Sequence, residues 1–207
     1  MTDEVGPRAD GVAPTIHILT SPAFSAQTVR SAMTALEQQF RVGVLHHEWS
    51  FDLEGAFDRP RGQYLSAALI RQMETDYPRP TEIKILGMID IDLFAPVLTF
   101  VFGEAQLGGS CAILSTFRLR NEFYGIPSNM EVLQTRVIKE AVHEVGHLFG
   151  LIHCRTFDCV MRSSTYVEEI DLKTENLCAE CRSNLNYVEI LNNETLSGMR
   201  REKIHRS

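Results

Sequence analysis

The chain has 207 residues, of which 44% are hydrophobic, and it carries a formal net charge of −7 at pH 7. This composition fits one globular domain with a sizeable core. An acidic chain without a dense basic stripe is a poor nucleic-acid binder, so we expect no nucleic-acid partner. Residues 1–14 carry charged side chains and no apolar run, which predicts a flexible leader rather than a signal peptide.

Hydrophobic periodicity predicts alternating strands and helices in the first half of the chain. Strands are predicted at residues 15–20, 41–49, 83–90 and 97–102, and helices at 26–40 and 63–77. The apolar run from 85 to 103 is about as long as a membrane span, but Asp90, Asp92 and Pro96 interrupt it. Each aspartate would cost roughly 3 kcal/mol at the centre of a bilayer, so we expect no membrane insertion.

The second half contains one more predicted strand and a long helix. The strand, at residues 110–119, follows the turn residues Gly108 and Gly109. Residues 127–129 can cap a helix over 130–150, and helical structure is predicted again from Val167. This order of elements predicts an α/β fold, with α+β as the alternative. We expect one compact, two-lobed domain over residues 15–195 and a tail at 196–207.

A histidine motif lies in the predicted long helix and just beyond it. Residues 143–153 read H-E-x-x-H-x-x-G-x-x-H. Positions i and i+4 share one face of a helix, so His143 and His147 can bind a single metal ion. Gly150 permits the left-handed turn that commonly ends a helix, so His153 can return as a third ligand. Three protein ligands leave a fourth position open, which is typical of a catalytic zinc site.

Glu144 directly follows the first histidine, where a general base for a metal-bound water should lie. The motif therefore predicts hydrolysis of a peptide bond by a zinc-bound water that Glu144 activates. Tyr124, Tyr166 and Tyr187 are candidates to stabilise the oxyanion, and the sequence selects none of them.

Four of the five cysteines form a second pattern. They are Cys154, Cys159, Cys178 and Cys181, which give C-x4-C, a gap of 18 residues and C-x2-C. Two such pairs are typical of a closed structural zinc site. Two disulfides, an iron–sulfur centre and four unrelated thiols are the alternatives, and disulfides are disfavoured because nothing marks the chain as secreted. The fifth cysteine, Cys111, is expected to be a small buried strand residue.

Other polar residues favour structural roles. His46 and His47 are neighbours in a predicted strand and therefore point to opposite faces, which argues against a shared metal site. Asp90 and Asp92 share a face at the end of another strand, where a role in the turn is favoured over cation binding.

Together the residues read H-E-x-x-H-x-x-G-x-x-H-C-x4-C-x-M, then 16 residues, then C-x-x-C. Over residues 103–181 this closely resembles the archaemetzincins, a family of zinc metallopeptidases of the metzincin clan, with one residue fewer before the last pair. The resemblance implies a metzincin-like mixed twisted sheet with an active-site helix. It implies catalytic zinc on the three histidines, Glu144 as general base and structural zinc on the four cysteines. It also implies that Met161 forms the turn below the catalytic zinc. For the edge strand along which such enzymes align a peptide, we predict the segment 110–119.

We therefore expect a zinc metalloendopeptidase or aminopeptidase-like hydrolase with two zinc ions per chain, acting on peptides or proteins. The alternative is a catalytically silent zinc-binding interaction protein, or a redox or zinc sensor. Glu144 argues against a silent protein, because zinc binding alone does not need that glutamate. We expect a cytoplasmic monomer without nucleic-acid or membrane partners.

Overall fold

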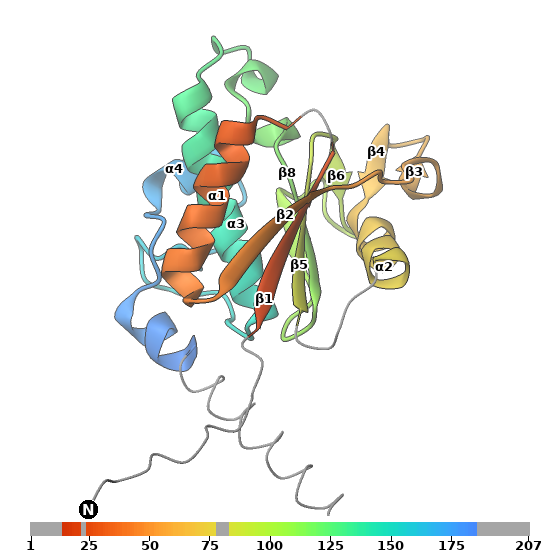
Figure 1. Cartoon of the computed structure of the whole chain (residues 1–207). Helices are drawn as coiled ribbons and strands as arrows, with labels where there is room; N and C mark the ends of the chain where they lie inside the picture. The colour runs from red at the N-terminus through yellow and green to blue at the C-terminus, as the bar shows by residue number, and fades with distance from the viewer. Residues whose placement is uncertain (1–13, 22–23, 78–82, 186–207) are drawn as a thin grey trace, which may run out of the picture.

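A five-stranded sheet runs through the middle of the molecule (Figure 1). The computed structural model describes residues 14–21, 24–77 and 83–185. The strand order is β2-β1-β5-β8-β7, and neighbours are parallel except for β7, which is antiparallel to β8. The strands are β1 (Thr15–Thr20), β2 (Gly43–Glu48), β5 (Ile83–Ile89), β7 (Gly103–Ala105) and β8 (Cys111–Ser115). The predicted α/β class with a mixed sheet is confirmed.

Helices cover both faces of this sheet, with α1 and α3 on one face and α2 on the other (Figure 1). Their bounds are α1 (Ala26–Phe40), α2 (Ser66–Asp76), α3 (Met130–Leu148) and α4 (Val167–Leu172), and residues 179–185 are also helical. In β5, Leu86 and Met88 join the core under α1 and α3, whereas Ile85 and Ile89 join the core under α2. Successive strand side chains point to opposite faces, so a strand covered on both sides is apolar throughout.

A small second sheet lies beside α2 (Figure 1). Its strands are β3 (Phe57–Asp58), β4 (Gln63–Leu65) and β6 (Leu93–Phe94), in the order β3-β4-β6. Single turns of 3₁₀ helix occur at η1 (Glu54–Ala56), η2 (Phe117–Leu119) and η3 (Asn121–Tyr124). The strand β4 occupies the first residues of the predicted helix 63–77, so that helix begins three residues later than predicted.

The predicted strand at 97–102 is wrong. Val97 has a left-handed backbone with a φ of 66°, and its side chain is fully exposed. The Leu98 N–H donates to Ala95 O at 3.1 Å, so the chain turns immediately after Pro96. Proline presets the first central position of such a turn, and this overrides the apolar character of the segment.

The prediction that residues 110–119 form the substrate's edge strand is also wrong. The strand β8 ends at Ser115 and pairs on both sides, with β5 and with β7. The edge position belongs to β7, which has only three residues and begins with a glycine, so hydrophobic periodicity does not predict it.

The long helix α3 begins as predicted. The Asn129 side chain accepts hydrogen bonds from the N–H groups of Glu131 and Val132, at 3.0 and 3.1 Å. Such a cap satisfies backbone donors that the first turn of a helix leaves free. None of the helices in the described part of the chain has the length and apolar character that crossing a bilayer requires. The predicted leader up to residue 13 and the predicted tail lie outside the described residues.

Candidate zinc sites and active-site cavity

The last turns of α3 and the loop after it bring three histidines together. His143 and His147 lie one turn apart on α3, and their Nε2 atoms are 3.1 Å from each other. Gly150, with a φ of 84°, reverses the chain after the helix, and His153 returns to the other two rings. One nitrogen from each of the three rings lies within 4.8 Å of the others. The arrangement predicted from the motif is therefore present.

The hydrogen bonds of the His143 and His147 rings fix which of their nitrogens carries the proton. His143 Nδ1 donates to Val160 O at 2.9 Å, and His147 Nδ1 donates to Leu151 O at 2.7 Å, since a carbonyl oxygen can only accept. Burial lowers the pKa of all three histidines, that of His143 most strongly, so the rings are neutral near pH 7. Neither Nε2 can then donate to the other.

Two bare Nε2 lone pairs that face each other need a cation between them. Tetrahedral zinc with Zn–N distances of about 2.0–2.1 Å separates its nitrogens by about 3.3 Å, close to the separation of 3.1 Å found here. A Nδ1–H that donates to a carbonyl is also the usual support of a zinc-bound histidine. The three histidines therefore fit a zinc ion.

Met161 lies directly below the histidine-bearing turn of α3 and is completely buried. A Cβ atom on Gly146 would collide with the sulfur of Met161, so this packing requires a residue without a side chain at position 146. The turn predicted from Met161 thus lies against the helix, and the absence of a side chain at Gly146 makes the close approach possible.

Glu144 is buried beside the histidines, with 4% of its surface exposed. A Cβ on Gly103 of β7 would lie 2.5 Å from Glu144 Oε1 and 2.8 Å from its Cγ, so this side chain fills the space that the glycine leaves. Burial raises the pKa of Glu144 well above its usual range, and the negative charge of Glu140 adds to the effect. A carboxyl group with a raised pKa can both accept and return a proton near neutral pH.

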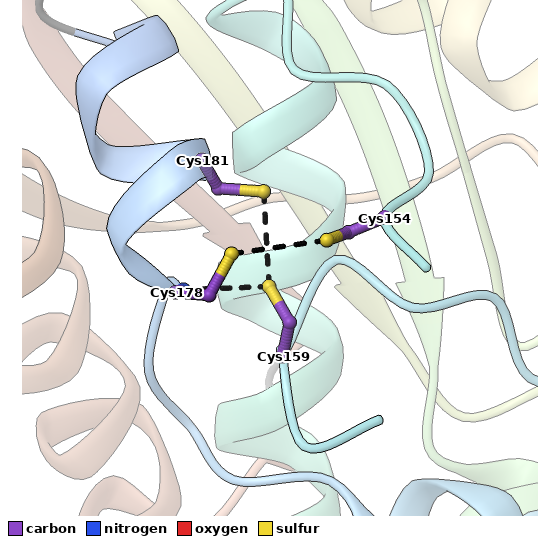
Figure 2. A group of neighbouring side chains, drawn as sticks. All are labelled: Cys154, Cys159, Cys178 and Cys181. Atoms are coloured by element: carbon purple, nitrogen blue, oxygen red, sulfur yellow. Dashed lines mark hydrogen bonds between the residues drawn. The ribbon is translucent and has the colours of Figure 1, made fainter. Parts of the chain in front are cut away.

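The four cysteines also converge (Figure 2). Cys154 and Cys159 come from the loop after α3, and Cys178 and Cys181 from the start of the 179–185 helix. The sulfur separations are 3.8 Å for Cys154–Cys178 and 3.7 Å for Cys159–Cys181, and none of these four cysteines forms a disulfide.

These sulfur separations match a zinc tetrahedron. Zn–S distances of about 2.3 Å place the corners about 3.8 Å apart. The Thr156 and Cys178 N–H groups donate to the sulfurs of Cys154 and Cys159, each at 3.4 Å, and such donors stabilise thiolates. Burial raises the pKa of Cys178, but hydrogen bonds from the Cys181 backbone and the neighbouring sulfurs outweigh it and bring the pKa down to about 7. The cluster fits a second zinc ion.

A cavity of 630 Å³ opens beside the three histidines. The edge strand β7 and the loop before it form one wall, and residues 163–165, just after the Met161 turn, form another. Leu98, Leu107 and Ile152 line it and are half to two-thirds exposed, so its rim is apolar. Tyr124 and Tyr166 do not line the cavity, and Tyr187 lies outside the described residues.

Sequence reasoning missed one buried pair at this cavity. Lys173 Nζ lies 3.2 Å from Glu140 Oε1 and donates to Arg162 O at 3.0 Å. Glu140 precedes Glu144 by one helical turn, whereas Lys173 follows α4. Glu140 could have been predicted to lie near Glu144, because the two glutamates are four residues apart on one helix. No pattern in the sequence connects Glu140 to Lys173.

The remaining polar candidates lie away from the cavity. The Asp90 carboxylate binds Arg120 and the Asp92 carboxylate binds Arg118, each through both oxygens. His46 Nε2 is 2.8 Å from Thr20 Oγ1.

The His47 ring lies tilted against the His17 ring, with the centroids 5.0 Å apart. His46 and His47 thus have separate surroundings, as their alternation in the strand predicted.

Comparison with known proteins gives a consistent result. The model of peptidase family M54 matches residues 51–187, which is more than half of the chain. The archaemetzincin of Methanocaldococcus jannaschii is 43% identical over 130 residues, which cover 63% of this chain and 70% of that one. The crystal structure of the Methanopyrus kandleri archaemetzincin has a TM-score of 0.75 at 30% identity, over 87% of this chain and 97% of that one. A zinc-dependent peptidase from Methanocorpusculum labreanum has a TM-score of 0.73 at 32% identity, over 82% and 99% of the two chains.

Proposed function

The chain belongs to peptidase family M54, the archaemetzincins, and is a zinc-dependent peptidase, and from this premise we propose that Glu144 is its general base. His143, His147 and His153 hold the catalytic zinc in this proposal, and the four clustered cysteines hold a structural one. The observation that carries it is the pair of bare Nε2 atoms 3.1 Å apart, with the Glu144 carboxylate buried next to them.

The chemistry of the chain's own residues follows from that placement. Zinc bound to the histidines supplies a Lewis acid that makes water more acidic. The Glu144 carboxylate accepts a proton from the attacking water and donates it to the nitrogen of the leaving amine. Its raised pKa suits both transfers, and contact with Gly103 limits where its oxygens can lie.

The edge strand β7 supports alignment of an extended substrate. Phe102 O accepts from Ser115 N, and Gln106 N donates to Cys111 O, so residues 102, 104 and 106 direct their backbone groups toward β8. In an antiparallel ladder the alternate residues point the other way. Gly103 and Ala105 therefore offer N–H and C=O groups along the free edge at the cavity, where a peptide can add as a further strand.

We propose a cytoplasmic monomer that binds neither nucleic acid nor membrane, supported by the net charge of −7 and by four thiols that a reducing compartment keeps available for metal. Light scattering of the zinc-loaded protein tests the monomer. A silent zinc protein is the weaker alternative, because it leaves the buried Glu144 without a role.

Digestion of a diverse peptide library, read by mass spectrometry, tests the proposed activity. We expect cleavage products that need zinc and that the Glu144→Gln variant does not make. Exo- and endopeptidase action are distinguished by whether cuts lie one residue from an end or within the peptides. Equal cleavage by the variant would show that Glu144 is not the base.

A further inference from the structure

A buried ion pair forms part of the wall of the active-site cavity. Glu140 lines the cavity one helical turn before Glu144, and its side chain is 5% exposed. Its partner Lys173 is 1% exposed and also donates to Arg162 O. The lysine thus ties the floor of the cavity on α3 to the start of the wall formed by residues 163–165.

One buried polar atom of this region, next to the ion pair, has no hydrogen-bond partner in the described part of the chain. Lys173 Nζ contacts Glu140 through Oε1, at 3.2 Å. Ser164 Oγ is buried without a hydrogen bond, and Ser164 lines the same cavity two residues beyond Arg162. A buried polar atom without a partner costs about 1–3 kcal/mol, so a ligand that pairs with Ser164 Oγ gains affinity.

The charges around Glu140 and Ser164 decide which kind of substrate side chain can bind there. Lys173 already balances the charge of Glu140, which removes the advantage of a cationic side chain. An acidic side chain meets the carboxylates of Glu140 and Glu144, which also line the cavity. An aliphatic side chain leaves the serine hydroxyl unpaired. A carboxamide carries N–H donors for the carboxylate and an oxygen that accepts from the hydroxyl.

We propose that Glu140, Ser164 and Lys173 form a subsite for a substrate side chain that ends in a carboxamide, glutamine or asparagine, next to the scissile bond. This rests on the proposed peptidase function of the same cavity. Sites that bind a polar group reject an apolar analogue because their own polar atoms then stay unpaired. We expect kcat/KM to be about 10–100-fold higher for the amide.

Matched peptides give a direct test. Glutamine is compared with methionine, and asparagine with leucine, at each position flanking the scissile bond, because each pair has a similar shape. The Ser164→Ala variant removes one partner and should reduce the preference for the amide. The double variant Glu140→Leu with Lys173→Met removes both charges together, which avoids an unpaired buried charge. It should abolish or invert the preference while both zinc ions stay bound.

Controls separate recognition from loss of structure. Ser128→Ala, at a serine that does not line the cavity, should keep the parent preference. Melting temperature and zinc content are measured for every variant. A preference that is absent in the parent protein, or unchanged in both Ser164→Ala and the double variant, would overturn the subsite.

Binding distinguishes failure of the subsite from failure of the proposed function. Calorimetry of the same peptides with zinc-loaded Glu144→Gln measures selectivity without turnover. Selective binding without hydrolysis by the parent protein would support the subsite and contradict the proposed activity. Hydrolysis without selectivity in either assay would support the activity and contradict the subsite.

Discussion

The histidine and cysteine sites are adjacent in the chain, since His153 is followed directly by Cys154. They differ, however, in the number of protein donors and in access to solvent. The histidine site has three protein donors and borders a cavity of 630 Å³. The cysteine site has four donors at the corners of a tetrahedron, and Cys159 and Cys181 are buried. A coordination position left open by the protein is typical of a catalytic zinc site, whereas a complete shell of four protein donors is typical of a structural one. The number of protein donors and the access to the cavity, more than position in the chain, therefore distinguish the catalytic from the structural zinc site.

The two sites nevertheless share one backbone segment. Cys154 N donates to Met161 O at 3.0 Å, which closes the loop between the first cysteine pair and the Met161 turn. Within that loop Val160 O accepts from His143 Nδ1. Loss of a ligand from the cysteine site should therefore also alter the histidine site, whereas a substitution in the cavity should leave the cysteine site unchanged.

The largest effect is expected from Cys178→Ser, which removes a donor from the closed site. Structural zinc contributes on the order of 10 kcal/mol in small zinc domains, and a domain with its own core depends on it less. A loss of about 3–5 kcal/mol would lower the melting temperature by about 10 °C in a protein of this size. Calorimetry and elemental analysis should show a destabilised chain that has lost the second zinc and part of its activity.

The matched control for that variant is Cys111→Ala. Cys111 is a buried cysteine of β8 that belongs to neither cluster. It should lower the melting temperature much less than Cys178→Ser does and keep both metals. An unchanged melting temperature with full zinc content in Cys178→Ser would remove this cysteine from the ligand set.

Glu144→Gln should have the next largest effect, confined to the open site. The amide keeps the shape of the side chain but cannot accept the proton. Loss of a general base typically costs ~10²–10⁴-fold in rate. Both zinc ions and the melting temperature should stay close to those of the parent protein. Glu131→Gln, in the exposed first turn of the same helix, is the control for a change of charge on α3. A variant at position 144 that hydrolyses peptides at the parent rate would reject the assignment.

The sequence predicted which histidines and cysteines come together better than it predicted the walls of the cavity. The histidine and cysteine spacings are local patterns, so their chelating geometry follows from helix periodicity and short loops. The edge strand could not be found in this way, because β7 has only three residues and begins with a glycine. The pair of Glu140 and Lys173 is 33 residues apart in the chain, and only tertiary packing brings it together. The turn at Val97 was missed because its apolar residues imitate a strand.

Gly103→Ala tests how closely the edge strand and the general base fit. The new methyl group would lie 2.5 Å from Glu144 Oε1, so the carboxylate has to move. A displacement of about 1 Å at a reacting group can cost about 10²-fold in rate, and we expect a loss of about 10–100-fold in kcat with zinc content unchanged. Gly43→Ala is the control, because its methyl group would meet only Thr15 Cγ2 at 4.0 Å. Full activity in Gly103→Ala would mean that the position of Glu144 tolerates this shift.

The smallest effect on the fold is expected when the histidine site alone loses its metal. Three neutral nitrogens, one of them on the exposed His153, hold zinc less tightly than four thiolates, so a chelator under reducing conditions should remove one equivalent first. That step should abolish peptide hydrolysis. The melting temperature should fall by only a few degrees, because Val142 and Val145 keep α3 packed in the core without metal. Removal of the second equivalent should then unfold or strongly destabilise the chain. Elemental analysis and melting curves along one chelator titration measure both steps. If the two equivalents leave together, or if loss of the first lowers the melting temperature as much as loss of the second, the division into an open catalytic site and a closed structural site is wrong.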